Sequence, residues 1–129
     1  MRKKNSKAEF GRQRSECLIR NFRESIARQS VISRIKALQE AADAPAPRFW
    51  VSEARATRVI AELLRGNDLT EGMIPEKRRM YLEILERVKR MTAFFPEKPL
   101  GDIVFEVVNS PAPSSFISAE TTYKIILKK

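Results

Sequence analysis

A segment of sixteen residues occurs twice in this chain, 66 positions apart and without a gap. Residues 45–60 begin Pro-Ala-Pro-Arg-Phe-Trp-Val-Ser, and residues 111–126 begin Pro-Ala-Pro-Ser-Ser-Phe-Ile-Ser. Five of the paired positions are identical and four are conservative, among them Trp50 with Phe116. A repeat of this length indicates one supersecondary unit used twice, so it constrains the fold more than any other feature.

Apolar residues at spacings of three and four predict helices in the first copy. The first is expected over about residues 8–29, and the second after a cap at Ser30, with Val31 and Ile35 in its apolar stripe. The Pro-Ala-Pro segment should form a stiff, extended connector. Ser52 is expected to cap a third helix that Gly66 ends.

The second copy repeats this order. Pro75 is placed to open a long helix that closes before Pro96, Pro99 to open a short helix, and Ser118 to cap the last one. The β-branched run at 103–108 is compatible with a strand, but its duplicate at 37–42 is rich in alanine and favours a helix.

These patterns predict an all-α fold of about six helices, arranged as two tandem three-helix pseudo-repeats joined into one bundle-like body. Residues 1–7 would be a basic N-terminal arm, residues 8–66 the first repeat and residues 67–129 the second. One copy of about 50 residues would have a marginal core, so the two are expected to form one compact domain.

The composition argues against catalysis. Histidine is absent, which removes the commonest general base and metal ligand, and neither a glycine-rich phosphate loop nor a metal-ligand pattern is present. The single cysteine, Cys17, lies among apolar residues and is expected to be a buried thiol. We therefore expect a non-enzymatic protein without cofactor or metal. No apolar run is long enough to cross a bilayer, and we expect a cytoplasmic location.

Positive charge is concentrated at the start of the chain. The net charge is +9, and residues 1–36 contribute +8 of it. Such a basic end attracts polyanions, with nucleic acid or an acidic protein surface as the usual partners.

Further cations lie on the third and sixth predicted helices and at the start of the fourth. Spacings of three and four place those of the third helix on one face. Basic side chains that contact phosphates provide most non-specific affinity for nucleic acid. The residues predicted to make such contacts are Arg2, Lys3, Lys4, Lys7, Arg12, Arg14, Arg48, Arg55, Arg58, Arg65, Lys77, Arg78, Arg79, Lys124 and Lys128.

Trp50 and Phe116 allow two interpretations. They are either structural anchors that fix the connector to the core, or aromatic platforms that stack on a base or enter a partner groove. The geometry of a basic helix behind another helix is that of a major-groove reader, but nine residues separate Ala42 from Ser52. A standard helix-turn-helix motif uses three or four, so that motif is not matched.

Residues 45–60, together with the segment Pro-Glu-Lys-Pro-Leu-Gly-Asp-Ile-Val-Phe-Glu-Val-Val-Asn-Ser-Pro-Ala-Pro at 96–113, resemble small basic helical proteins of gut Bacteroidetes genomes and their mobile elements. The resemblance covers about the last two thirds of the chain and implies a bacterial cytosolic or phage-related setting.

Our first hypothesis is a nucleic-acid-binding accessory or regulatory protein that uses the basic arm and the cationic helix faces on phosphates, with DNA favoured over RNA. The alternative is a helical protein–protein interaction or assembly module, in which the arm docks an acidic partner or serves solubility.

Overall fold

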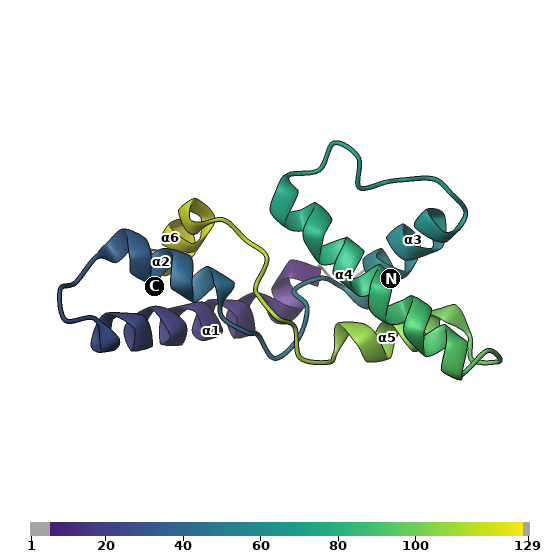
Figure 1. Ribbon diagram of the computed structural model, residues 1–129, viewed down its shortest axis with the longest axis horizontal. Coiled ribbons are helices and arrows are strands. Elements are labelled where there is room, and N and C mark those ends of the chain that lie inside the picture. The colour runs from purple at the N-terminus through teal and green to yellow at the C-terminus, as the bar shows by residue number, and fades with distance from the viewer. Residues whose placement is uncertain (1–5, 128–129) are drawn as a thin grey trace. The chain divides into compact units, whose positions relative to one another are not determined.

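The computed structural model describes residues 6–127. This part of the chain forms six helices and no strand (Figure 1). The predicted all-α class is therefore confirmed, and the run at 103–108 is helical, as its alanine-rich duplicate indicated.

Three helices form one packing unit, which we call the terminal unit because both ends of the chain belong to it. Its described part comprises residues 6–46 and 112–127. Helix α1 (Ser6–Arg28) packs mainly on α2 (Arg34–Asp43), and α6 (Ala119–Leu127) lies against both (Figure 1).

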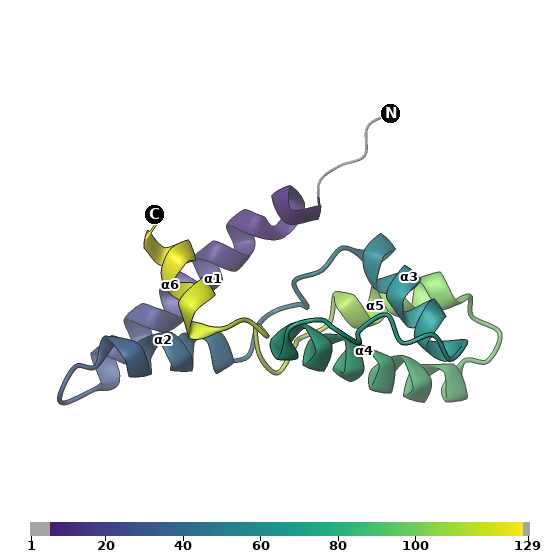
Figure 2. The ribbon, with the colours of Figure 1, turned by 90° about the horizontal axis from the view of Figure 1, so that it is seen from above.

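The other three helices form the central unit, residues 47–111. Helix α5 (Leu100–Val108) contacts both α3 (Glu53–Leu64) and α4 (Pro75–Phe94), which also contact each other (Figure 2). Tyr81 and Ile84 of α4 and Val104 of α5 are fully buried side chains of this unit.

The packing units are not the same segments as the sequence repeats. In each unit, two successive helices of one copy pack with the third helix of the other copy: α1 and α2 with α6, and α4 and α5 with α3. The expected grouping over residues 8–66 and 67–129 thus describes the repeat in the sequence, whereas the helices pack across it.

Extended connectors explain this exchange. The backbone N–H of Ala46 donates to the carbonyl of Ala112 over 2.9 Å, and the N–H of Ala112 donates to the carbonyl of Ala46 over 2.8 Å. These two residues are equivalent in the repeat. The flanking prolines keep each connector extended, so it carries its third helix away from its own copy.

A second pair of backbone hydrogen bonds follows the same symmetry. The N–H of Phe49 donates to Val108 over 2.9 Å, and its equivalent 66 residues later, Ser115, donates to Ala42 over 3.0 Å. Each connector therefore binds the end of the second helix of the other copy. The duplicated Pro-Ala-Pro sequence encodes a reciprocal pairing.

Most predicted helix ends are found in the structure. Ser52 and Ser118 each accept a backbone N–H from three residues later, over 3.1 Å and 3.0 Å, which is N-capping. Pro75 is the first residue of α4. Gly66 follows α3 with φ of +96°, a conformation that favours glycine.

The start of α2 differs from the prediction. Ser33, rather than Ser30, caps the helix by accepting the N–H of Lys36 over 3.3 Å. Val31 and Ile35 consequently lie outside the apolar face, with 83% and 70% of their surface exposed. Alanines 37, 41 and 42 form the buried side of this helix instead, because small side chains allow close packing.

Within residues 6–127, no helix combines the length and apolar character that crossing a membrane requires.

Candidate nucleic-acid interface

The positive charge of the sequence divides unequally between the two packing units. Residues 1–46 and 112–129 contain fourteen lysines and arginines against six acidic residues, whereas residues 47–111 contain eleven against ten. The terminal unit therefore carries nearly all of the excess. Long-range attraction of a polyanion acts on this unit first.

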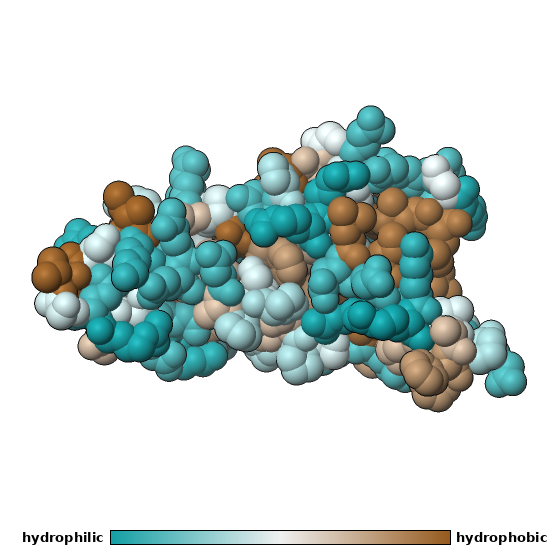
Figure 3. Space-filling view, in the orientation of Figure 1, coloured by the Kyte–Doolittle hydropathy of each residue, from teal (hydrophilic) through white to brown (hydrophobic). Residues whose placement is uncertain are grey.

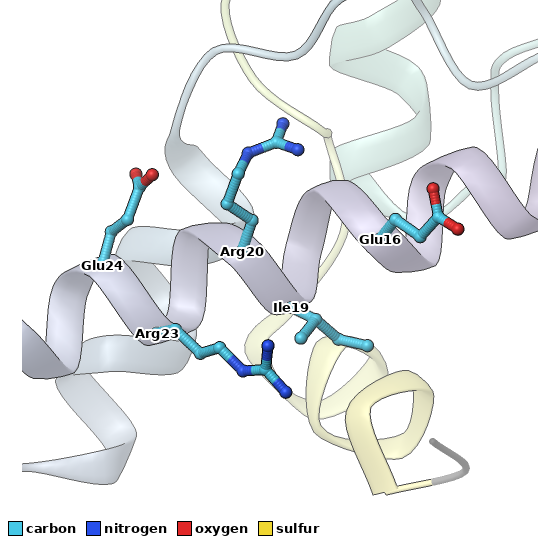
Figure 4. A pocket seen from close by; sticks show the side chains of 5 residues that line it. All are labelled: Glu16, Ile19, Arg20, Arg23 and Glu24. Carbon is cyan, nitrogen blue, oxygen red and sulfur yellow. The ribbon is translucent and has the colours of Figure 1, made fainter.

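Helix α1 contributes exposed cations from successive turns. Arg12, Arg20 and Arg23 are exposed, and none of them forms an ion pair with another described residue. Figure 4 shows Arg23 and Ile19 pointing toward α6, whereas Arg20 extends from another side of α1. These three guanidinium groups are available to an external anion.

Two glutamates moderate the charge on this helix. Glu16 and Glu24 line a shallow hollow of about 460 Å³ together with Ile19, Arg20 and Arg23 (Figure 4). Equal numbers of acidic and basic side chains surround it. The hollow itself is therefore not an anion site, and Arg20 and Arg23 would meet an anion only from outside it.

Arg14 is the half-buried member of the predicted set. Burial lowers the pKa of its guanidinium, and its Nε has no hydrogen-bond partner among the residues that the structure describes. Much of this side chain faces protein, so it presents less surface to a phosphate than Arg12 does.

The structure places Lys124 in the same unit as α1, because α6 packs there. Its side chain is exposed and lies 3.8 Å from Glu120 at the start of α6. An exposed pair of this kind is weak and does not prevent a phosphate contact. Arg2, Lys3, Lys4 and Lys128 lie outside the described residues, and Lys7 lies in α1 with its side chain not described.

The cations of α3 belong to the central unit. Arg55 and Arg58 are exposed, as predicted, but Arg65 binds Glu62 with a distance of 2.6 Å between Nη1 and Oε2. Burial raises the pKa of Tyr81 in α4, and the nearby charge of Arg55 partly offsets that rise. Arg55 of α3 therefore lies close to Tyr81 of α4.

The three basic residues at the start of α4 have two different environments. Lys77 and Arg79 are exposed. Arg78 donates from Nε to Thr70 over 3.1 Å and lies 3.3 Å from Asp68, so it fixes the loop before the helix. Hydrogen bonds from the Thr70 hydroxyl and backbone N–H lower the pKa of Asp68, with a smaller effect from Arg78.

Arg48 stabilises its own connector. Its Nε donates to the carbonyl of Phe49 over 2.9 Å, and its Nη2 donates to the carbonyl of Val51 over 2.6 Å. Neighbouring Trp50 is only 7% exposed. This burial favours the anchor interpretation of Trp50 over base stacking.

Phe116, the equivalent of Trp50, has a different environment. It is half-buried, and its φ of +53° lies in the left-handed region that side chains other than glycine rarely adopt. The Ser114 hydroxyl accepts its N–H over 2.8 Å and holds this conformation.

Sequence reasoning missed an exposed apolar group at the end of the α1–α2 hairpin. Val31, Ile32 and Ile35 are 83%, 61% and 70% exposed. Figure 3 shows apolar atoms at this end of the hairpin, next to hydrophilic ones. The helical spacing placed Val31 and Ile35 in a core stripe, and only the late start of α2 reveals their exposure.

Within the described chain, no group of three or more cysteine, aspartate or glutamate residues is placed to hold a metal ion. Comparison of the chain with protein-family models, curated proteins and solved structures finds no match.

Proposed function

We propose that this protein is a non-enzymatic nucleic-acid-binding accessory or regulatory protein of the bacterial cytoplasm, with duplex DNA as its preferred target. The basic arm, α1 and α6 of the terminal unit bind phosphates. The central unit supplies further exposed cations on α3 and α4. The finer architecture behind this proposal is two three-helix pseudo-repeats that have exchanged their third helices.

One observation carries the proposal. The sequence segments of the terminal unit contain fourteen basic residues against six acidic ones, and nine of the basic residues lie in its described part. Among these, Arg12, Arg20 and Arg23 are exposed without an ion pair in the described structure. A fold needs no such excess, because like charges on a compact unit repel. A polyanion that neutralises them releases its counterions and gains affinity.

A protein-interaction module remains the second candidate, because the central unit has its own exposed apolar group. Phe94 and Phe105 are 80% and 54% exposed, and the Lys98 ammonium lies 4.9 Å from the centre of the Phe95 ring. Aromatic residues are enriched at protein interfaces. In this alternative the acidic partner of the arm would be a protein.

The test is equilibrium binding to duplex and single-stranded DNA and RNA across a salt series. We expect duplex affinity to fall steeply with salt, with a log–log slope of about −0.9 for each phosphate contact. Replacing Arg12, Arg20 and Arg23 with glutamine should lower affinity and reduce the slope by about 3 if each contacts one phosphate.

A matched variant separates specific contacts from net charge. Replacing Arg79, Lys89 and Arg90 of α4 with glutamine removes the same charge from exposed positions of the central unit. It should have a smaller effect on affinity. Equal losses in both variants would remove the assignment to the terminal unit, and no detectable binding by the native protein at low salt would exclude the proposed function.

A further inference from the structure

The α1–α2 hairpin ends in three β-branched side chains that are mostly exposed. Val31, Ile32 and Ile35 are all more than half exposed. Exposed single apolar residues are ordinary, but three of them at the end of one hairpin form an apolar tip. These side chains could be buried only by an apolar surface of a binding partner.

Basic side chains surround this tip. Arg28 and Lys36 line one shallow hollow with Val31, and Arg34 is exposed next to Ile35 in the sequence. Glu40 also lines this hollow and lies 3.6 Å from Arg28. The tip therefore combines apolar atoms with a net positive collar.

The positive charge of the collar is unfavourable for the dipole of α2. Asp or Glu stands in the first turn of each of α3, α4, α5 and α6, where negative charge favours the helix dipole. The first turn of α2 has no acid and instead contains Arg34 and Lys36. Positive charge is thus placed where it costs stability.

Hydrogen bonds hold the tip in one conformation. Gln29 accepts the N–H of Ser33 over 2.6 Å and donates to Ser25 over 3.2 Å. Ser25 is fully buried and donates to Glu40. A rigid loop can insert into a partner without first losing conformational freedom.

We propose that the apolar tip is a wedge that enters the minor groove of duplex DNA and partly unstacks a base step, while Arg28, Arg34 and Lys36 bind the flanking phosphates. This inference rests on the proposed function and adds a consequence to it, which is bending. Proteins that insert apolar side chains in this way kink the duplex by roughly 20–90° toward the major groove.

The positive charge of the collar favours nucleic acid as the binding partner of the tip. A purely apolar partner site would favour a neutral collar, whereas phosphates flank every base step at the edges of the minor groove. Aliphatic side chains occur as such wedges, and the flexible TA and CA steps are the least costly to unstack.

The experiment measures bending and affinity separately. A duplex of about 30 base pairs with a central TA step, labelled at both ends, reports its end-to-end distance by fluorescence energy transfer. The native full chain should shorten that distance. The double variant Val31→Ser with Ile32→Ser should lose most of the shortening, whereas its salt slope should stay unchanged because no cation is removed.

Phe94→Ser is the matched control. Phe94 is 80% exposed at the end of the α4–α5 hairpin, which is equivalent in the repeat, and the nearby Lys98 is paired with Glu106. Its replacement should preserve bending, and an equal loss would overturn the assignment to the α1–α2 tip.

Two further results would overturn the wedge. Salt-dependent binding without bending would refute the wedge and leave the proposed function intact, whereas absence of binding would refute both. Native protein that binds vesicles of phosphatidylserine and phosphatidylcholine, does not bend DNA and loses vesicle binding in the double variant would assign the tip to a lipid surface instead.

Discussion

Trp50 and Phe116 occupy the same position of the repeat in two different environments. Trp50 is buried, whereas Phe116 is half-buried and has a positive φ. Truncation of a residue that anchors a connector should lower the stability of the protein. Truncation of a residue that stacks on a base should instead lower the affinity for nucleic acid. Truncating each of the two residues therefore distinguishes the anchor from the stacking interpretation.

Trp50→Ala should destabilise the protein strongly, by about 3–5 kcal/mol, because it removes a large buried side chain. Phe116→Ala should cost less, since that side chain is already partly exposed. Chemical denaturation followed by circular dichroism measures both. A Trp50→Ala variant of native stability with weakened binding to single-stranded DNA would instead support stacking.

Some residues were predictable because their roles are local. Ser52, Ser118 and Gly66 act on backbone groups a few residues away, and their chemistry can be read from the chain. The sequence predicts phosphate contacts for Arg48, Arg65 and Arg78. The partners of Arg48 and Arg78 are set by loop geometry, whereas Arg65 pairs with Glu62 three residues earlier at the end of α3. Composition alone does not distinguish an arginine that binds groups of its own protein from one that is exposed to solvent.

At the scale of elements, the first turn of α2 contains cations and no acidic residue to offset them against the helix dipole. Arg34 is its first residue and lies where a carboxylate would be favourable. We expect Arg34→Glu to stabilise the protein by about 0.3–1 kcal/mol at low salt and Arg34→Gln to give an intermediate value. Thermal unfolding at two ionic strengths measures this series.

The series tests whether the collar is kept for binding. If Arg34 contacts phosphate, Arg34→Glu should weaken duplex binding while it raises stability. A variant that is less stable than the native protein would show that Arg34 stabilises α2 through packing, and that its charge does not destabilise the helix. High salt should reduce the stability difference, because the charge is exposed.

Helix existence was predictable, and the boundary of α2 was not. Periodicity predicted five of the six helices, and the alanine-rich duplicate at 37–42 decided in favour of a helix at 103–108. Residues 30–33 contain two serines, and either can cap a helix. The hydrogen bond from Ser33 to Gln29 decides between them, and this contact joins the loop to the preceding helix.

On the scale of the whole chain, the repeat and the packing follow different boundaries. Periodicity shows which face of a helix is apolar but not which apolar face it meets. The stiff Pro-Ala-Pro connector was visible in the sequence, and its antiparallel pairing through Ala46 and Ala112 was not. Exchange of the third helices depends on that pairing.

The exchange predicts which fragment of the chain folds alone. Residues 47–111 contain every helix of the central unit in one continuous segment. Residues 67–129 are almost as long and correspond to the second sequence repeat, but they lack α3 and contain α6 without α1 and α2. Domains of about 55–65 residues can fold without partners when their core is complete.

We therefore expect residues 47–111 to be helical and to unfold cooperatively, and residues 67–129 to show weak helicity without a cooperative transition. Circular dichroism during thermal unfolding distinguishes the two. Addition of residues 1–66 to residues 67–129 should restore cooperative unfolding, because each fragment supplies the third helix that the other lacks. If residues 67–129 unfold as cooperatively as residues 47–111, α6 packs on its own copy and the exchange is not required for folding.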